Sequence, residues 1–597
     1  MNILIDKIRV KNFRALKNIE ISLKTITILV GANNSGKTTM LRALNSVLGM
    51  SRNQINQDDL FIDNKGNQPS KEITIDIRII PTDEQGNRIQ NFDYKWNSKI
   101  GILGVQTEND NEYIAFRTTY HFDVEDTPII KYQAFSNWEN EQLNTDELKG
   151  FNQARNNMKM YFVDAQRDIL DDIKQRTSFF GKLVSQLDYG ENLDTLKKQI
   201  ASLNEEAIDK SEVLKHLKEE LKKLNQTTQT KGEGVSLNPF PKKITDLHKG
   251  MKVYFQDSQS DSFSMENHGM GTRSWASIIT AGAFSSWQMQ QIEKKIVNGE
   301  ETDLLFPIFA FEEPEAHLHP NAQRTLYKQL KAFKGQKIIS THSPYIAGQA
   351  ELDELRNFYK DQDSTIVSEI VLHGDLEMTR KIKNEVIETR GEILFGKVVV
   401  TYEGQTEKLC LPIFAEKYFG QSHFELGVFF TDASGNNHKP FIKLAESLNI
   451  PWFIFSDYDK LNIQNGVKNA LEYVGQTIES NNLIKLEKSI EQYLVEGGYQ
   501  DELKGGINNF YLKTCNEDAP KGQVEAGQRR VNAWNDDQLL VELKKDDSKV
   551  KYPIYWASEI VKRNDASCMP PKIRELFDKI SKVLNLKAEQ NEQSDTI

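Results

Sequence analysis

The sequence predicts an α/β fold in two parts, each with a parallel sheet, and three observations carry this prediction. The stretch ITILVGANNSGKTTM is an apolar strand, a glycine-rich loop and the start of a helix. Further on, LDTLKKQIASLNEEAIDKSEVLKHLKEELKKLNQ repeats apolar residues at helical spacing and predicts a helical insertion. In the second half, KVVVTYEG and PWFIFSDYDK are apolar runs that end in acidic residues, as strands of a parallel sheet do at a functional edge.

Composition limits the classes of protein to which this chain can belong. At 597 residues it is too long for one hydrophobic core, so several domains are expected. Hydrophobic residues make up 38% and charged residues 27% of the chain, as in a globular protein with a polar surface. The net charge of −11 excludes a surface that is basic throughout. Any nucleic acid must therefore be bound by a local patch or through a metal site.

Redox and targeting signals favour the cytoplasm. The cysteines Cys410, Cys515 and Cys568 are scattered and form neither a disulfide framework nor a zinc site, which favours a reducing compartment. The N-terminal stretch MNILIDKIRVKNF carries charges where a signal peptide needs an apolar core. No apolar run approaches the roughly 20 residues of a membrane span, so no membrane partner is expected.

We expect four segments along the chain, which are, in order, residues 1–165, 166–235, 236–378 and 379–597. The first holds strand-like runs such as ITIDIRI and GILGV, at 73–79 and 101–105, and a helix after Gly36. The second has the pattern of a solvated helical arm, for which a dimer interface is the functional interpretation. The third resumes the strand and helix signals of the first, and the fourth contains the second α/β pattern.

The glycine-rich loop has the spacing of a P-loop. Gly31 is followed by four residues and then by Gly36, Lys37 and Thr38, between an apolar strand and a helix. Glycines let backbone amides close around phosphates at the N-terminus of the helix. Lys37 is expected to reach the β- and γ-phosphates of ATP, and Thr38 to ligate Mg²⁺. The nucleotide-binding residues that we predict in this loop are Gly31, Asn33, Asn34, Ser35, Gly36, Lys37, Thr38 and Thr39.

Two later stretches supply the partners of this loop. LLFPIFAFEEP is an apolar strand that ends in Glu312 and Glu313, the form of a Walker B motif. We predict that Glu312 lies on the magnesium side and that Glu313 orients or activates the attacking water. An acidic helix start is the alternative, but it would not explain the long apolar run. KIISTHSP ends a further strand at His342, for which contact with the γ-phosphate is favoured over a structural role.

Together these motifs resemble the ABC-type ATPases of the SMC and RecF kind. The resemblance is carried by IRVKNFRALKNIEI, the P-loop, FEEPEAHLHP and STHSP. It implies an ATPase split by a helical insertion, with a signature loop that reaches the nucleotide of a second subunit, and hence at least a homodimer. ENHGMGTRS, with Gly269 and Gly271, is the matching stretch, although it departs from the usual LSGGQ string. QDDLF places Asp59 where the family has its Q-loop.

The second α/β region gathers carboxylates. Glu403 ends one apolar strand, and Asp457 and Asp459 end another, where parallel sheets place functional groups. Glu407 lies four residues after Glu403, so a helix that begins between them can bring both side chains towards one face. Four carboxylates in one place repel one another unless a cation is held there. Oxygen ligands favour Mg²⁺ or Mn²⁺, and two ions about 4 Å apart can clamp a phosphodiester.

The stretches VVVTYEGQTE and FSDYDK resemble the Toprim domain of topoisomerases, primases and certain nucleases. A Toprim domain that follows this kind of ATPase is similar to the OLD (overcoming lysogenisation defect) nuclease family, and the resemblance covers most of the chain. It implies a further acidic residue, matched by Glu491, and a late lysine, matched by Lys551. Lys549 and a plain surface lysine are the alternatives for the latter. Tyr402 stands where an aliphatic residue is usual, and the Walker B motif opens with Glu312 rather than with aspartate.

The resemblance implies an ATP-binding, metal-dependent DNA endonuclease that nicks or cuts both strands and is regulated by its ATPase head, in defence against phage. Its implied partners are DNA, further copies of the chain up to a tetramer, and a defence protein. That protein is a UvrD-like helicase, as in Gabija systems, or a retron reverse transcriptase with its ncRNA and msDNA. An SMC-like ATPase that clamps DNA, with a structural Toprim domain, is the alternative. A topoisomerase-like enzyme would need a nucleophilic tyrosine in a separate domain, and no stretch resembles one.

Overall fold

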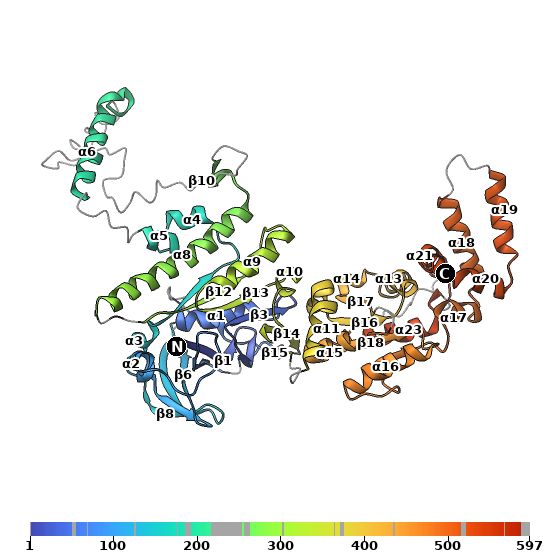
Figure 1. Cartoon of the computed structure of the whole chain (residues 1–597), viewed down its shortest axis with the longest axis horizontal. Coiled ribbons are helices and arrows are strands. Elements are labelled where there is room, and N and C mark those ends of the chain that lie inside the picture. Colours follow the sequence, from blue (N-terminus) through green and yellow to red (C-terminus); the bar gives the residue numbers. More distant parts are fainter. Residues whose placement is uncertain are drawn as a thin grey trace.

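The structure of the chain is a computed structural model, which Figure 1 shows as an elongated molecule. The sheets of the N-terminal half lie towards one end and the C-terminal helices towards the other. The structure describes residues 2–49, 55–68, 70–123, 127–175, 177–184, 193–215, 254–255, 263–300, 302, 304–362, 364–370, 375–433, 436–514, 521–565 and 568–586.

An antiparallel sheet forms the outer part of the N-terminal lobe. Its strands, in spatial order, are β2 (Leu16–Ser22), β1 (Asn2–Phe13), β4 (Glu72–Thr82), β6 (Asn111–His121), β7 (Ile129–Asn137) and β8 (Gln142–Glu147), and β5 (Val105–Glu108) pairs with β6. Successive residues point to opposite faces. Ile8 and Val10 therefore enter the core, while Arg9 between them binds Glu20 of β2 at 3.0 Å on the other face. The alternation in the sequence fixes which face of this sheet is buried.

The run GILGV is not the strand that the sequence predicts. Gly101–Leu103 form a single 3₁₀ turn, η2, directly after helix α2 (Tyr94–Ile100). Gly104 then has a φ of 90°, which glycine adopts at little cost, and the chain reverses before β5 begins. Ile100 and Leu103 are buried at this turn, so the apolar residues pack into the core without forming a strand. Helix α3 (Phe151–Arg155) follows β8.

The second sheet carries the ATPase motifs. Its strands, in spatial order, are β15 (Ser364–Glu369), β14 (Leu355–Asp361), β3 (Ile26–Gly31), β13 (Gln336–Ser340), β12 (Phe306–Glu312) and β9 (Met158–Val163). Neighbours are parallel except for β14 with β15. β3, β12 and β13 are buried along their whole length, as strands covered on both faces are. Because parallel strands end at the same edge, the residues that follow these three strands meet there.

Helices cover this sheet and lead into the predicted insertion. They are α1 (Lys37–Leu48), α8 (Met270–Val297), α9 (Pro320–Ala332), α10 (Pro344–Ala347), α4 (Ile169–Lys174), α5 (Phe179–Val184) and α6 (Leu193–Lys210). α4 and α5 pack on α8, where the rings of Phe179 and Phe284 lie 6.3 Å apart and Ser277 donates to Asp172. α6 stands away from the sheets in Figure 1. Part of the predicted insertion, including 216–235, lies outside the described residues.

Several short elements precede α8, and others lie between α10 and the second α/β region. They are β10 (Tyr254–Phe255), β11 (Phe263–Ser264), η5 (Met265–Asn267), η6 (Leu352–Glu354), α11 (Leu376–Lys381), the π-helix η7 (Ile382–Ile387), α12 (Glu388–Arg390) and η8 (Gly391–Phe395). The connector from α11 to η8 shares one continuous core with both of its neighbours. This core runs from Ile346 of α10 through Ile387 and Leu394 to Val399 of the next sheet. The two halves of the molecule are therefore packed against each other and not merely tethered.

The third sheet is parallel throughout, as the sequence predicts. Its strands, in spatial order, are β17 (Val428–Asp432), β16 (Val398–Tyr402), β18 (Trp452–Ser456) and β19 (Leu483–Lys485). Its helices are α13 (Gln405–Phe419), α14 (His423–Leu426), α15 (Lys439–Ser447), α16 (Leu461–Tyr473) and α17 (Ile490–Glu496). β16 and β18 are neighbours and are buried along their length, so Glu403 and Asp457, which follow them, meet at one edge.

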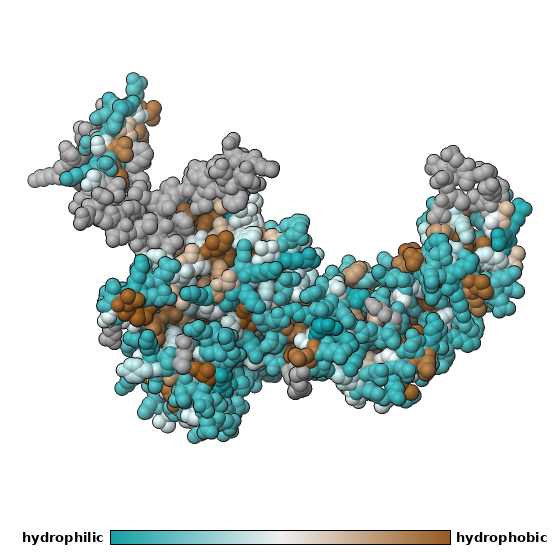
Figure 2. Space-filling view, in the orientation of Figure 1, coloured by the Kyte–Doolittle hydropathy of each residue, from teal (hydrophilic) through white to brown (hydrophobic). Residues whose placement is uncertain are grey.

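A group of helices closes the C-terminal end. They are α18 (Gln500–Thr514), α19 (Lys521–Asn532), α20 (Asp536–Leu543), α21 (Ser548–Lys551), α22 (Pro553–Ile560) and α23 (Pro571–Val583). α22 packs between α13 and α18, with Trp556 buried in the shared core. On the face in Figure 2, hydrophilic residues cover most of the surface and hydrophobic residues occur in separate patches. Among the described helices, none combines the length and the apolar character needed to cross a lipid bilayer.

Candidate functional site

The P-loop wraps the N-terminus of α1. The predicted residues from Gly31 to Thr39 form one continuous loop and the first turn of the helix. Gly31 and Gly36 have φ values of 128° and 101°, and a side chain at Gly31 would meet the Phe358 carbonyl oxygen at 2.1 Å. Only glycine fits such positions at little cost. Ser35 Oγ is buried without a hydrogen-bond partner, so this loop has a polar atom to offer to a ligand.

Lys37 is the cation of this loop. Its Nζ donates to the carbonyl oxygens of Gly31 and Ala32, at 2.8 and 2.9 Å. Burial lowers the pKa of Lys37 to about 8, while the charges of Glu313 and Glu315 act in the opposite direction. An ammonium group that is buried against neutral carbonyls gains from a nearby anion. The loop therefore fits the phosphates of a nucleotide.

The Walker B strand and His342 come to the same edge as the P-loop. Glu312 is buried at the end of β12, where the Thr38 hydroxyl bonds to it. Burial raises the pKa of Glu312, and the bond to Thr38 opposes this shift. Glu313 is more exposed, and its Oε1 lies 3.8 Å from His342 Nε2. Burial and then the charge of Lys37 lower the pKa of His342.

Sequence reasoning missed two charged residues that brace this edge. Glu315 Oε1 accepts from Thr341 Oγ1 and from the His342 amide, both at 2.7 Å. Arg167 Nη2 donates to the Pro314 carbonyl at 2.7 Å, and burial lowers the pKa of Arg167 to about 10. The sequence offered only weak signals for them: a third glutamate in EEPE, and an arginine in DAQRD after a strand.

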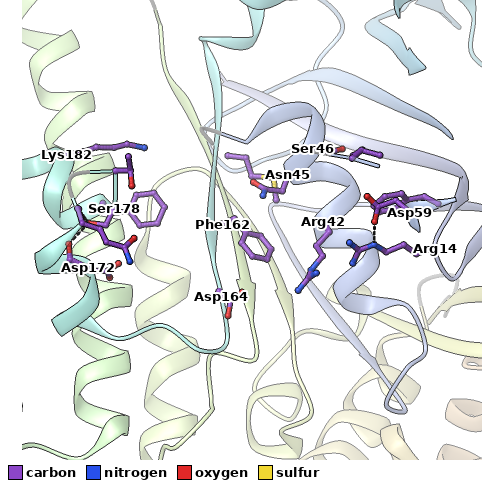
Figure 3. Close-up of a pocket in the computed structure, with 16 residues that line it drawn as sticks. Arg14, Arg42, Asn45, Ser46, Asp59, Phe162, Asp164, Asp172, Ser178 and Lys182 are labelled. Atoms are coloured by element: carbon purple, nitrogen blue, oxygen red, sulfur yellow. Dashed lines mark hydrogen bonds and ion pairs between the residues drawn. The ribbon is translucent and has the colours of Figure 1, made fainter. Parts of the chain in front are cut away.

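A cavity of about 590 Å³ lies beside these elements (Figure 3). α1 supplies one wall, and α4 and α5 supply the other. Arg42 of α1 and Asp164 after β9 line the cavity, and the charges of both act on Glu312. Asp59, the predicted Q-loop residue, ends the 3₁₀ turn η1 (Gln57–Asp59) and lines the same cavity, where Arg14 binds it at 2.6 Å. Two residues that line the cavity therefore act electrostatically on the Walker B carboxylate Glu312.

The predicted signature stretch begins α8. Gly269 is the N-cap of the helix, and Gly271 lies in its first turn. A side chain at Gly271 would meet the His317 carbonyl oxygen at 2.4 Å, so the stretch packs against the loop that follows β12. Arg273 in the same turn lies 3.4 Å from Asp168.

Four of the predicted carboxylates meet in the second α/β region. Glu403 follows β16 and Asp457 follows β18, and the Asp457 amide donates to Glu403 Oε2 at 3.3 Å. Glu407 lies in the first turn of α13, and Glu491 in the first turn of α17. Thr406 Oγ1 donates to Glu491 Oε1 at 2.8 Å, which joins the two helix starts. We refer to Glu403, Glu407, Asp457, Asp459 and Glu491 as the carboxylate centre.

The carboxylate centre carries more negative charge than its surroundings compensate. Burial raises the pKa of Glu407 to about 8, and the charges of Glu403 and Glu491 add to the shift. Burial and the charges of Glu407 and Glu491 raise the pKa of Asp457 well above its usual value. Hydrogen bonding to the backbone and to Asp457 acts in the opposite direction on the pKa of Glu407. Asp459 is exposed at the rim, and its charge adds to the shift of Asp457.

The oxygen donors of this centre are the kind that a divalent cation prefers, but the side chains are not yet placed to hold one. Its donors are carboxylate oxygens, which Mg²⁺ and Mn²⁺ prefer. In the part of the chain that the structure describes, no three His, Cys, Asp or Glu side chains are already placed to hold a metal ion. Glu403, Asp457 and Glu491 each accept a hydrogen bond from a neighbouring group instead. Cation binding therefore requires some side chains of the centre to turn.

His438 is a further residue at the centre that sequence reasoning missed. It lies in the stretch SGNNHKPF and is the N-cap residue of α15. Its Nε2 is 3.0 Å from Glu403 Oε1, although the two residues are far apart in the sequence. No local pattern in the sequence indicates such a long-range contact.

The two candidate lysines differ in their surroundings. Lys551 is exposed on α21, where its Nζ lies 2.6 Å from Asp547. Lys549 is half-buried on the same short helix, which packs against α13, the helix that carries Glu407. Because Lys551 is exposed and paired with Asp547, the lower exposure of Lys549 favours Lys549 of the two.

The chain is similar to proteins of known type over most of its length. Residues 4–347 match the family model described as AAA ATPase domain, and residues 394–459 match the overcoming lysogenization defect protein-like TOPRIM domain. An OLD nuclease of Thermus scotoductus is 24% identical over 490 residues, which are 76% of this chain and 82% of that protein. An endonuclease GajA of Bacillus cereus is 23% identical over 487 residues, which are 79% of this chain and 77% of that protein. The solved Smc head bound to the C-winged helix domain of ScpA covers 62% of this chain and 99% of its own, at 16% identity and a TM-score of 0.34.

Proposed function

The chain belongs to the OLD family, in which an ATPase domain is followed by a Toprim domain, and we propose that it is an ATP-regulated, metal-dependent DNA endonuclease. The observation that carries the proposal is the meeting of Glu403, Glu407, Asp457 and Glu491 at the edge of one parallel sheet. Like charges that are buried together destabilise a fold, so their presence favours a bound cation. The names of the relatives, OLD nuclease and endonuclease GajA, support this reaction class.

In this proposal Glu403, Glu407, Asp457 and Asp459 hold the cations, and Glu491 supports them from α17. When bound, Mg²⁺ or Mn²⁺ supplies an activated water and neutralises charge at the scissile phosphate. A bound cation would offset the burial and the mutual repulsion that raise the pKa of Glu407 and of Asp457. Lys549, the less exposed of the two lysines, adds positive charge near the leaving oxygen.

The ATPase head binds ATP and controls access to the carboxylate centre. Lys37 contacts the phosphates, while Thr38 and Glu312 hold the magnesium of the nucleotide. Glu313 orients the attacking water, and His342, 3.8 Å from it, contacts the γ-phosphate. The hydrogen bond between Thr38 and Glu312 supports this division of roles.

The nucleotide site is completed by a second copy of the chain in this proposal. Gly269 and Gly271 stand at the N-terminus of a long helix, where backbone amides favour an anion. A homodimer, or a tetramer built through the insertion 166–235, would present them to the partner's nucleotide. The same proposal divides the chain into an N-terminal ATPase lobe, the insertion, a C-terminal ATPase lobe and a Toprim unit, with boundaries after residues 165, 235 and 378.

Incubation of the purified protein with supercoiled plasmid tests the proposed activity. Mg²⁺ or Mn²⁺ should support nicking or linearisation by the wild-type protein, and EDTA should stop it. The doubly substituted Asp457→Ala/Asp459→Ala protein should leave the plasmid intact, because it lacks two of the proposed ligands. Lanes with and without ATP give the sign of the regulation. Equal cleavage by this variant would rule out the carboxylate centre as the nuclease site.

A DNA-clamping ATPase with a structural Toprim unit is the second candidate. The meeting of Glu403, Glu407, Asp457 and Glu491 counts against it, because a purely structural unit has no reason to bury like charges together. It predicts ATP-dependent retention of circular DNA by the wild-type protein, with no cleavage under any metal condition. Covalent attachment of the protein to DNA would instead indicate strand passage through a tyrosine.

We extend the proposal to a role in defence against phage. The name of a relative, endonuclease GajA, supports this role. The proposed partner is a UvrD-like helicase or a retron reverse transcriptase with its ncRNA and msDNA. Plating of phages on cells that express the chain, alone and with its neighbouring genes, tests it. The Asp457→Ala/Asp459→Ala protein should give no protection, and equal protection by this variant would contradict a nuclease role in defence.

A further inference from the structure

His438 is a fully buried histidine with both ring nitrogens engaged. None of its surface is exposed. Its Nδ1 lies 2.9 Å from Thr401 Oγ1, and its Nε2 lies 3.0 Å from Glu403 Oε1. A buried polar ring is costly unless its nitrogens are hydrogen-bonded, and two opposed bonds fix the orientation of the ring. The surroundings of His438 therefore define one position for it.

In the hydrogen bond between His438 and Glu403, only the histidine can be the donor. A carboxylate oxygen accepts, so His438 Nε2 must carry the hydrogen. In the neutral ring this requires Nδ1 to accept, and the hydroxyl of Thr401 supplies that hydrogen; in the charged ring both nitrogens donate. Thr401 is itself buried in β16, and its single hydroxyl hydrogen can go to the Phe453 carbonyl oxygen, 3.4 Å away, when the ring is charged and Nδ1 donates. The histidine thus presents a donor to Glu403 in either state.

Glu403 is held at both of its oxygens. Oε1 takes the hydrogen bond from His438, and Oε2 takes one from the Asp457 amide at 3.3 Å. These two contacts set the plane of the carboxylate relative to the end of β18. A carboxylate fixed in this way loses less conformational entropy when it binds a ligand.

The loop around His438 is anchored on two sides. The Ala433 amide donates to the Tyr402 carbonyl at 2.8 Å, and the Asn437 amide donates to the Ala433 carbonyl at 3.0 Å. The Asn437 side chain also donates to Glu385 of the π-helix η7, in the connector from the ATPase. His438 is therefore placed by β16 on one side and by the connector on the other.

We propose that His438 is a positioning residue that orients Glu403 for the divalent cation, with Thr401 orienting the histidine in turn. This inference rests on the proposed function, since it assigns a support to one of the proposed ligands. Groups that hydrogen-bond to metal ligands typically contribute about 10- to 100-fold to metal affinity.

Mn²⁺ affinity of the nucleotide-free full chain, measured by calorimetry, tests this role. His438→Leu removes both ring nitrogens and should weaken Mn²⁺ binding about 10- to 100-fold. His438→Gln places an amide near the position of Nε2 and should stay within about threefold of the wild-type protein, while Thr401→Val should fall between the two. His438→Leu with wild-type affinity would overturn the proposal, and so would His438→Gln with a loss as large as that of His438→Leu.

Control variants separate a positioning role from a general loss of structure. His423 is a second buried histidine of the same region, and its Nδ1 lies 2.9 Å from the Val428 carbonyl. His423→Leu should lower the unfolding temperature and leave Mn²⁺ affinity unchanged among folded molecules. An equal loss of Mn²⁺ affinity in His423→Leu would show that the effect of His438 is merely structural.

Asp457→Asn separates this inference from the proposed function. If Mn²⁺ binding is lost in Asp457→Asn but kept in His438→Leu, the metal site stands and the role of His438 falls. If Mn²⁺ binding survives Asp457→Asn unchanged, the metal lies elsewhere and both proposals fall.

Discussion

Glu407 is 2% exposed and surrounded by like charges, so burial of its carboxyl group opposes folding. We predict that Glu407→Gln stabilises the metal-free protein by about 2 kcal/mol, because it removes the cost of burying an ionisable carboxyl among like charges. The same change should abolish cleavage, since a proposed ligand is lost. Thermal unfolding in EDTA measures the first effect and the plasmid assay the second.

Glu416→Gln is the matched control for Glu407→Gln. Glu416 lies on the same helix, α13, but is exposed, so its substitution should change neither stability nor cleavage. A Glu407→Gln protein that unfolds at a lower temperature than the wild-type protein in EDTA would contradict the repulsion described for the carboxylate centre.

Lys337 gives a prediction for the dependence of stability on pH. It is 4% exposed, its Nζ donates to two backbone carbonyls, and burial lowers its pKa from 10.5 to about 8. A base with a lowered pKa in the folded state costs stability below that pKa, and the cost disappears as the pH rises towards the unfolded value. Lys337→Met should therefore stabilise the protein by about 2 kcal/mol at pH 7, and its advantage should vanish near pH 10.

Urea unfolding of both proteins at pH 7, 8.5 and 10 measures this advantage. Lys328→Met, which changes an exposed lysine of α9, controls for a general effect of lost positive charge. If Lys337→Met were less stable than the wild-type protein at pH 7, the bonds of Lys337 to the carbonyls would outweigh its burial.

At the scale of elements, α21 offers a comparison between two neighbouring lysines. Lys551 is exposed and paired with Asp547, while Lys549 is half-buried on the helix that packs against α13. We predict that Lys549→Ala lowers the rate of plasmid cleavage about 100-fold, as loss of a charge-stabilising group does. Lys551→Ala should stay within about threefold of the wild-type rate, and a larger loss in Lys551→Ala than in Lys549→Ala would reverse the assignment.

The sequence predicted the elements whose signals are local. The P-loop, the Walker B strand and the strands that end at Glu403 and Asp457 each combine an apolar run with a motif at its end, and these elements lie where expected. The prediction of a strand for GILGV was wrong. Its glycines and the preceding helix set its backbone conformation, and its apolar residues indicate only that the stretch is buried.

The residues that the sequence did not reveal depend on contacts between distant elements. Glu315 acts through Thr341, Arg167 through the loop after β12, and His438 through Glu403. In each case the partner belongs to another element, and only the sheet order brings the two together. Hydrophobic periodicity and short motifs carry no information about such pairs.

At the scale of the whole molecule, the contact between the two halves suggests how the ATPase reaches the carboxylate centre. The rings of His342 and Phe395 lie 6.3 Å apart, and Phe395 ends the connector just before β16, the strand that leads to Glu403. We predict that Phe395→Ala brings the ratio of cleavage rates with and without ATP closer to one, while the rate without ATP stays within about threefold.

Phe424→Ala is the control for Phe395→Ala. Phe424 is 66% exposed in the same region, so its loss should leave the effect of ATP unchanged. An unchanged ATP effect in Phe395→Ala would show that the nucleotide acts by another route, such as a change in assembly.

The measurement that tests the account most directly is plasmid cleavage together with ATP binding for Lys37→Ala and Asp457→Asn. The account predicts that Asp457→Asn binds ATP normally but does not cut, because only the carboxylate centre has been changed. Lys37→Ala should lose ATP binding and every effect of ATP on cleavage, and it should cut at the rate that the wild-type protein shows without ATP. Cleavage by Asp457→Asn at the wild-type rate would contradict the claim that the carboxylate centre is the nuclease site.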